Sequence, residues 1–286
     1  MQFTISREAL IKPLQMVSAV VERRQTLPVL SNVLLVLNGD ELSLTGTDLE
    51  VELISRVTVD SSSADGEITV PARKLSDICK SLSDDAILEF TLSETKLTLQ
   101  SGRSRFTLTT LPATEFPSVE EEPDTFSLTI AQQKLKELLD NTSFAMAQQD
   151  VRYYLNGMLF EIDPEFFRVV ATDGHRLAMQ TVTMSNQTES TQQLILPRKG
   201  ILELNRLISD GDADITLTFG NNHIRAKMPT FTFTSKLVDG KFPDYNRVLP
   251  KGGNKIVTGN CDDLKRAFSR ASILSNEKFR GVRVVL

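Results

Sequence analysis

The sequence predicts an α+β fold built from tandem copies of one domain, with two helices packed on antiparallel sheets in each copy. Two observations predict it. A set of landmarks recurs along the chain with a period of about 125 residues. Within each period, short runs that alternate apolar and polar residues accompany two segments with the spacing of amphipathic helices. We therefore expect many strands and few helices, arranged in the same order in each copy.

The repeat is defined by landmarks that keep their order. Three pairs recur at an offset of 125 or 126 residues: Thr47-Asp48 with Thr172-Asp173, Val70-Pro71 with Leu196-Pro197, and Phe116-Pro117 with Phe242-Pro243. This period is too long for a solenoid unit and suits a globular domain. We expect domains at residues 1–122 and 126–248, and the beginning of a third copy at 254–286. The acidic run 120–124 is interpreted as an exposed linker.

The elements of each complete copy follow one order. Each copy opens with an alternating strand and an apolar helix, FTISREALIKPLQMV from residue 3 and FSLTIAQQKLKELL from residue 126. Alternating runs such as NVLLVL and LEVELISRVTV are separated by turn formers, which predicts antiparallel hairpins. A second helix follows, PARKLSDICKSL in one copy and PRKGILELNRLI in the other, each with a proline near its first turn.

The third copy is expected to be represented by its first elements only. KIVTGNCDDLKRAFSRASIL begins with a strand-like run and places Asp262 or Asp263 where it would cap a helix. Leu264, Phe268 and Ala271 then follow at helical spacing. The chain is thus expected to end one helix and part of a strand into this copy.

Composition is typical of a globular cytoplasmic protein. Apolar residues make up 40% of the 286, enough for a large core. No apolar run approaches the roughly 20 residues of a membrane span, and Arg7 and Glu8 near the start argue against an export signal. Cys79 and Cys261 lie outside any CxxC or Cys/His cluster, so neither a disulfide framework nor a zinc site is expected.

The formal net charge of −5 argues against binding to nucleic acid, but the distribution of charge along the chain argues for it. The expected helical segments 6–24, 71–84, 131–149, 197–208 and 262–280 together carry +7, so the remaining residues carry −12. The Lys and Arg residues of any single helix are most simply explained as a solvent-exposed face. Four of the five segments are positive in an acidic chain, however, which predicts a helical face that attracts phosphate. The absence of tryptophan argues against a stacking groove for single strands, with Tyr153-Tyr154 as the exception.

Asp173 and His175, in ATDGHRLA, are two of the residue types used in triad catalysis. Thr47-Asp48 occupies the matching place in the first copy without a histidine after it, so a shared Asx-turn is the favoured interpretation. His223, in the turn-forming stretch FGNNHIR, is expected to be solvated. We expect no catalytic residue, no metal ligand and no cofactor, while a hydrolase centred on Asp173 and His175 stays an alternative.

Stretches along the whole chain resemble one known family. They are FTISREALIKPLQ, LSLTGTDLE, VPARK, SGRSRF, DVRYYLNGMLFE, ATDGHRLA, SKLVDGKFPDYNRVLP and ILSNEKFRGVR. Together they resemble signature stretches of the bacterial DNA sliding clamp, the beta subunit of DNA polymerase III. The resemblance implies protomers of three clamp domains in a head-to-tail dimer, closing a ring whose inner helices face duplex DNA.

The resemblance also implies site residues. DNA contacts would fall on Arg24, Arg73, Gln149, Tyr153 and Tyr154. A pocket for partner peptides would be formed by Leu155, Thr172, Gly174, His175, Arg176, Leu177, Pro243, Arg247 and Val248. The dimer interface would involve Lys74, Arg103, Phe106, Leu108, Ile273 and Leu274.

The implied function is that of a non-enzymatic clamp that encircles duplex DNA and confers processivity. Implied partners are duplex DNA, the polymerase III catalytic subunit, the clamp loader complex, other replication and repair proteins with a clamp-binding motif, and a second copy of the chain. Because the family's chain continues through a complete third domain, we expect that this chain cannot close the ring alone. Alternatives are a sequence-independent DNA-binding protein that does not encircle DNA, and a single-strand or operator-binding protein.

Overall fold

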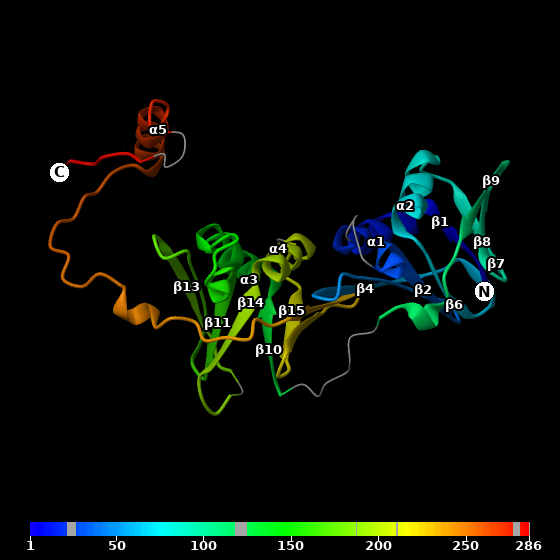
Figure 1. The fold of residues 1–286 in the computed structure, drawn as a ribbon, viewed down its shortest axis with the longest axis horizontal. Coiled ribbons are helices and arrows are strands. Elements are labelled where there is room, and N and C mark those ends of the chain that lie inside the picture. The colour runs from blue at the N-terminus through cyan, green and yellow to red at the C-terminus, as the bar shows by residue number, and fades with distance from the viewer. Residues whose placement is uncertain (22–26, 118–124, 187, 210, 277–280, 286) are drawn as a thin grey trace. The chain divides into compact units, whose positions relative to one another are not determined.

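The structure is a computed structural model that describes residues 1–21, 27–117, 125–186, 188–209, 211–276 and 281–285. It divides into two units, Met1–Phe242 and Pro243–Leu286, and each is described by itself. The strands and the first four α-helices all lie in the first unit (Figure 1). Arg24 and the run 120–124 lie outside the described residues, and the expected domain ranges stay predictions.

The first copy has the expected order of elements. It opens with β1 (Gln2–Ser6) and α1 (Arg7–Val20), and its second helix is α2 (Ala72–Ser81). Two short 3-10 helices are η1 (Pro28–Ser31) and η2 (Ala113–Glu115). The other strands are β2 (Asn32–Asn38), β3 (Glu41–Thr47), β4 (Val51–Thr58), β5 (Ser61–Ala64), β6 (Gly66–Pro71), β7 (Ile87–Ser93), β8 (Lys96–Ser101) and β9 (Ser104–Thr109).

The second copy repeats this order. It opens with β10 (Phe126–Ala131) and α3 (Gln132–Asp140), and its second helix is α4 (Arg198–Leu207). Between these helices lie the 3-10 helices η3 (Ser143–Ala145) and η4 (Tyr153–Leu155). The other strands are β11 (Gly157–Asp163), β12 (Phe166–Thr172), β13 (Leu177–Thr183), β14 (Gln192–Pro197), β15 (Asp214–Phe219), β16 (His223–Lys227) and β17 (Phe231–Lys236). Strands and helices therefore confirm the α+β fold predicted from the repeat.

The two copies share one sheet. Its strand order is β10-β15-β16-β17-β4-β3-β2-β6, so β17 of the second copy pairs with β4 of the first. The pairing is antiparallel and runs from Phe231 opposite Ser55 to Ser235 opposite Val51. Two smaller sheets, in the orders β5-β1-β7-β8-β9 and β13-β12-β11-β14, complete the unit. One hydrophobic core extends through both copies as a result.

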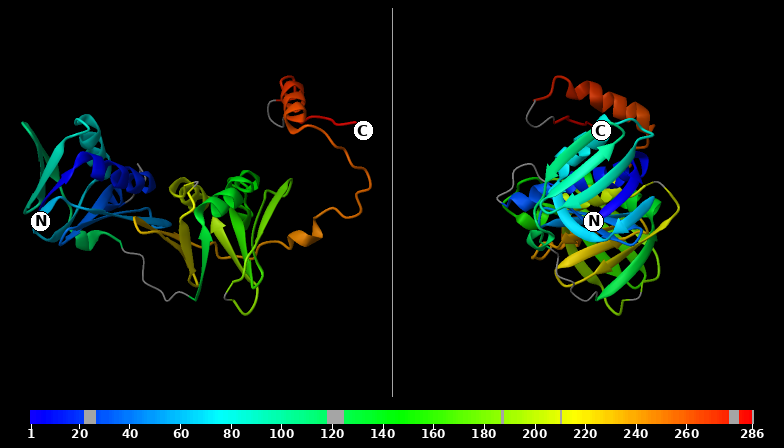
Figure 2. Two further views of the ribbon diagram at one scale, coloured as in Figure 1. Left: turned by 180° about the vertical axis from the view of Figure 1, so that it is seen from behind. Right: turned by 90° about the vertical axis from the view of Figure 1, so that its right-hand side faces the viewer.

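The helices bury one face each against these sheets. Helix α1 begins after Ser6, whose side chain accepts a hydrogen bond from the backbone N–H of Ala9 at 3.3 Å. Its residues Leu10, Leu14 and Val17 follow at the spacing of one helical face and are fully buried. The four helices gather on one side of the first unit (Figure 2). No helix among the residues that the structure describes is long and apolar enough to span a bilayer.

The second unit contains η5 (Tyr245–Arg247) and one regular helix, α5 (Cys261–Ser272). The prediction that Asp262 or Asp263 caps this helix was wrong, because the Asn260 side chain accepts hydrogen bonds from both of their backbone N–H groups. The strand-like run from Lys255 forms no strand, since no described strand pairs with it. No residue of α5 is buried.

His223 differs from its prediction of a solvated loop residue. It is the first residue of β16, pairs with Lys236 of β17, and is 3% exposed. The turn expected there is real, since the N–H of Gly220 donates to the carbonyl of His223 at 2.9 Å. The imidazole is buried because Gly220 leaves room for it: a Cβ at that position would lie 2.6 Å from the ring.

Candidate functional site

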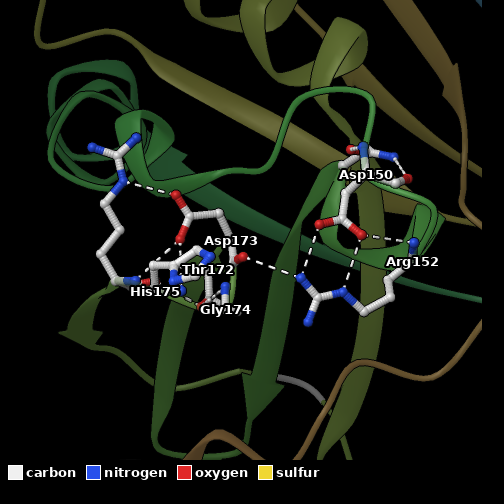
Figure 3. A network of polar contacts seen from close by, with 8 residues as sticks. Asp150, Arg152, Thr172, Asp173, Gly174 and His175 are labelled. Carbon is white, nitrogen blue, oxygen red and sulfur yellow. Dashed lines mark hydrogen bonds and ion pairs between the residues drawn. The ribbon is translucent and has the colours of Figure 1, made fainter. Parts of the chain in front are cut away.

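The segment Thr172–Arg176, which connects β12 to β13, forms a turn held by its own side chains (Figure 3). The Asp173 carboxylate accepts hydrogen bonds from the backbone N–H groups of His175 and Arg176, at 2.9 and 3.0 Å. The Thr172 hydroxyl donates to the carbonyl of Arg176 at 2.7 Å and accepts from the N–H of Gly174 at 3.1 Å. The backbone N–H bonds to Asp173 make this an Asx-turn.

The first copy contains the same turn between β3 and β4. Asp48 accepts from the N–H groups of Glu50 and Val51, and the Thr47 hydroxyl donates to the carbonyl of Val51 at 2.9 Å. The third residue of each turn has a positive φ, 78° at Leu49 and 86° at Gly174. The interpretation of Thr-Asp as shared turn chemistry is confirmed. Because Asp173 is occupied in the turn, its bonds favour a structural role over the hydrolase alternative.

Arg152 joins this turn to the preceding loop. Its guanidinium donates to both carboxylate oxygens of Asp150, at 3.0 and 2.8 Å, and to the carbonyl of Asp173 at 3.3 Å (Figure 3). The side-chain hydrogen bond from Arg152 and the bond from its backbone N–H lower the pKa of Asp150 to about 2. Sequence reasoning missed Arg152, although its spacing of two from Asp150 in DVRYYLNG permits this bidentate contact.

Phe144 of η3 is a second residue beside the Thr172–Arg176 turn that the sequence analysis did not predict. The Arg176 guanidinium lies over its ring, 5.5 Å from the centroid, and the ring is largely exposed. A guanidinium over an aromatic face is attracted by the ring quadrupole. The Arg176 side chain also forms an ion pair with Asp173, with Nε and Oδ2 3.0 Å apart. Phe144 gave no signal in the sequence, since single exposed aromatic residues are common.

The residues implied to contact DNA from the second copy lie on the loop that carries Arg152. Gln149 is exposed with a φ of 56°. Tyr153 is 57% exposed, whereas Tyr154 is half-buried, and their rings meet edge to face with centroids 5.8 Å apart. The expectation that at least one tyrosine points outward is confirmed. Gly240 lies against Tyr153, because a Cβ there would be 3.3 Å from Cε2.

The residues implied to bind partner peptides differ in exposure. Gly174, His175 and Arg176 are exposed, whereas Leu177 is half-buried at the start of β13. Leu155 is buried, with an exposed fraction of 2%, so its side chain supports the loop rather than facing solvent in this structure. Pro243, Arg247 and Val248 are exposed and belong to the second unit.

The basic side chains expected on helices lie on α2 and α4 most clearly. Arg73 and Lys74 are exposed in the first turn of α2. The helices of the two copies are also in contact, since the Arg206 guanidinium of α4 donates to the carbonyl of Met16 in α1 at 3.1 Å. The helical layer of the first unit is therefore continuous from one copy to the next.

Apart from Lys74 in α2, the residues implied at a dimer interface lie in two places, at β9 and after α5. Arg103, Phe106 and Leu108 lie on or just before β9, the edge strand of its sheet. Leu108 is 5% exposed, so β9 offers its backbone at this residue rather than an apolar side chain. Ile273 and Leu274 follow α5 in the second unit and are strongly exposed. Among the described residues, no group of three or more His, Cys, Asp and Glu side chains could hold a metal ion.

Comparisons with known families cover nearly the whole chain. The N-terminal, central and C-terminal domains of the DNA polymerase III beta subunit match residues 1–120, 129–244 and 246–286. The chain belongs to the DNA polymerase III beta subunit family. The two copies of the repeat thus fall in the regions that match the N-terminal and central domains of this family.

Relatives of this beta subunit chain are beta sliding clamps. The clamp of Pseudomonas aeruginosa is 62% identical over 286 residues, which are all of this chain and 78% of the relative. The clamp of Escherichia coli K12 is 51% identical over 284 residues, 99% of this chain and 77% of the relative. A crystal structure of a Pseudomonas aeruginosa sliding clamp bound to griselimycin has a TM-score of 0.95 and 62% identity, covering 98% of this chain and 76% of that one.

Family membership gives this chain the function of a sliding clamp in DNA replication. The sequence match extends over all of its residues and does not establish the truncation expected from the sequence. Ring closure, the DNA contacts and the peptide pocket stay predictions.

Proposed function

We propose that this sliding clamp encircles duplex DNA through its helical face and holds the replicative polymerase on the template without catalysing a reaction itself. The continuous helical layer supports this most, because α2 and α4 are net positive in a chain whose formal charge is −5. Such a layer attracts the phosphate backbone regardless of sequence, while an acidic outer surface repels it. We place this activity in the cytoplasm, where the bacterial chromosome is copied.

The test is duplex binding measured over several unrelated sequences and a range of salt concentrations. Affinities that agree between sequences and fall steeply with salt are expected, because phosphate contacts release counterions without reading bases. Affinity confined to one sequence would favour the operator-binding alternative. Preference for single strands over duplex would favour the other alternative, a single-strand binder.

We further propose that clamp domains associate head to tail through strand edges, as β4 and β17 do within this chain. Counted through the repeat, β13 is the counterpart of β4, and β9 is the counterpart of β17. Each of these two strands is the last in its sheet among the described strands. The unit therefore presents one edge of each type, which is the arrangement that a heterologous, ring-forming interface requires.

We also propose that the Thr172–Leu177 segment is the part of the first unit that partner peptides contact. Its residues Gly174, His175 and Arg176 are exposed, its backbone is hydrogen-bonded by the Asp173 and Arg152 side chains, and the Arg176 guanidinium lies over the exposed Phe144 ring. A preorganised loop reduces the ordering cost of binding. Partners proposed for it are the polymerase III catalytic subunit, the clamp loader and other proteins with a clamp-binding motif.

Leu177→Ser tests this site with griselimycin, the ligand that the Pseudomonas aeruginosa clamp binds, as a probe. The variant is expected to bind at least tenfold more weakly, because a half-buried apolar contact becomes polar. Leu202→Ser on α4, also an exposed apolar position, is the control and should bind as the unchanged chain does. Equal binding by all three proteins would show that the site lies elsewhere.

A further inference from the structure

The sheets of the first unit end in edge strands whose outer sides differ. The edge of β6 is covered at Thr69, which exchanges backbone hydrogen bonds with Leu111 at 3.1 and 3.2 Å. The edge of β14 is covered by Val238, whose N–H donates to the carbonyl of Ile195 at 2.9 Å. β5 is a polar strand of four residues, and β9 and β13 are the edges proposed above for association. Among the described strands this leaves β10 with no neighbour assigned to its outer side.

β10 has none of the features that keep an exposed edge from pairing. Natural edge strands are protected by charged side chains, by proline, by a bulge or by very short length. β10 has the sequence FSLTIA, and its six residues pair with β15 in unbroken register, from Phe126 opposite Phe219 to Ala131 opposite Asp214. An edge of this kind is suited to accept another strand.

The open backbone groups of β10 can be identified from its pairing with β15. In an antiparallel pair, residues that bond to the opposite strand alternate with residues whose N–H and C=O point away from it. Directly after β10, the N–H of Gln132 donates to the carbonyl of Ala213 at 3.0 Å. By this alternation the N–H and C=O groups of Ser127, Thr129 and Ala131 point to the open side. The side chains of Ser127 and Thr129 are exposed as well.

The first copy shows what fits this edge. β1 is the counterpart of β10, and on the matching side it pairs antiparallel with β5, the strand SSSA. There the N–H of Asp60 donates to the carbonyl of Thr4 at 2.9 Å, and the hydroxyls of Thr4 and Ser61 are hydrogen-bonded. Thr4 and Thr129 occupy the same place in the repeat, 125 residues apart. The edge of β10 is therefore suited to an extended segment with small hydroxyl side chains.

The described residues of the second copy do not supply this strand. β5 lies between β4 and β6, so its counterpart is the segment between β13 and β14. In that segment the N–H of Asn186 donates to the carbonyl of Pro164 at 2.9 Å. The Asn186 side-chain amide donates to the carbonyls of Asp163 and Phe166. Asn186 is thus bonded to the hairpin of β11 and β12, and no described residue of the segment pairs with β10.

We propose that the outer edge of β10 binds an extended segment of a partner protein, which joins the eight-stranded sheet as an antiparallel strand. The segment carries serine or threonine beside Thr129, as Ser61 lies beside Thr4 in the first copy. Main-chain hydrogen bonds to the three outward-facing residues provide affinity, and the alternating side chains of the segment provide specificity. This interaction does not depend on the proposed DNA contact.

The probe is an acetylated and amidated synthetic peptide with the sequence of residues 58–64, which contains β5. NMR measures the amide hydrogen exchange and chemical shifts of the full chain with and without the peptide. Exchange of the Ser127 and Thr129 N–H groups is expected to slow, because they become hydrogen-bonded. The same peptide N-methylated at the position of Asp60 lacks the donor that bonds to Thr4 in the first copy. It should bind about tenfold more weakly.

Thr129→Pro tests the edge from the side of the protein. It removes an outward N–H without breaking a hydrogen bond to β15, and proline is tolerated at such edge positions. The variant should bind the peptide about tenfold more weakly, because a main-chain hydrogen bond is lost. Thr129→Val is the matched control: it keeps the N–H and should lose far less affinity, since water competes for the exposed hydroxyl that it lacks. Thermal unfolding establishes that both variants are folded.

Slowed exchange at β10 that the N-methylated peptide fails to produce supports the proposal. Changes confined to β9 or β13, or no change at all, overturn it. If Thr129→Pro does not fold, the comparison of the two peptides still decides the result. Self-association of the unchanged chain that protects the same N–H groups without peptide would assign the edge to a second copy, which also overturns the proposal.

Discussion

Asp48 and Asp173, 125 residues apart, accept the same two backbone hydrogen bonds in two copies of one turn, yet they pair with different cations. Asp173 pairs with Arg176 of its own turn, whereas Asp48 forms an ion pair with Lys199 of α4 in the other copy. The same local structure therefore serves an exposed loop in one copy and the junction between copies in the other.

Lys199→Ala is expected to lower the free energy of unfolding by about 2 kcal/mol, because it leaves a buried carboxylate without its cation. The Asp48 side chain is only 3% exposed, so water cannot replace the lysine fully. Urea unfolding measures the change. Lys134→Ala removes an exposed pair with Glu137 and should change the free energy of unfolding far less, because water and salt screen that pair. Equal losses in the two variants would contradict a special role for Lys199.

Gly174→Ala is expected to destabilise the chain by about 1 kcal/mol or more, since its φ of 86° disfavours any residue with a Cβ. The added Cβ would also lie 3.0 Å from the Nη1 of Arg152 and push the guanidinium aside. Gly253→Ala, where no atom lies within 4 Å, is the control. Chemical denaturation of both variants checks the difference, and a neutral Gly174→Ala would argue against this turn geometry.

Arg152→Ala is expected to raise the pKa of Asp150 back toward its usual range, because the side-chain hydrogen bond from Arg152 is the main cause of its low value. Carboxyl NMR titration measures it. A lowered pKa stabilises the fold where the carboxylate is charged, so this contribution is present above about pH 4 and is lost as the pH falls toward 2. The variant should therefore lose less stability than the unchanged chain across that interval. An unaltered Asp150 titration would show that the Arg152 contact is absent in solution.

Replacing Arg24 and Arg73 together by alanine is expected to weaken duplex binding about equally for all sequences. The slope of log affinity against log salt should fall by about 2, one unit for each lost phosphate contact. Lys96→Ala/Lys227→Ala removes two charges from strands and should leave the slope unchanged. A loss that depends on the DNA sequence would contradict backbone contact.

The sequence by itself determined the features that depend on neighbouring residues or on periodicity. The 125-residue repeat, the two helices of each copy and the Thr-Asp turn all follow from patterns within a few positions. Helix periodicity and side-chain bonds two or three residues apart are local, so they can be predicted without knowing the fold. The family resemblance extended this to function, because its motifs lie along the whole chain.

Only the tertiary structure decided which distant segments meet. Three examples are the pairing of β17 with β4, the hydrogen bond from Arg152 to Asp173 and the burial of His223 beside Gly220. The sequences of these elements do not predict which partner they contact. An edge strand can pair with any exposed edge of suitable register, and a polar residue is buried only when neighbouring atoms leave it room. The partners were selected by packing both copies of the first unit around one core, which no local pattern specifies.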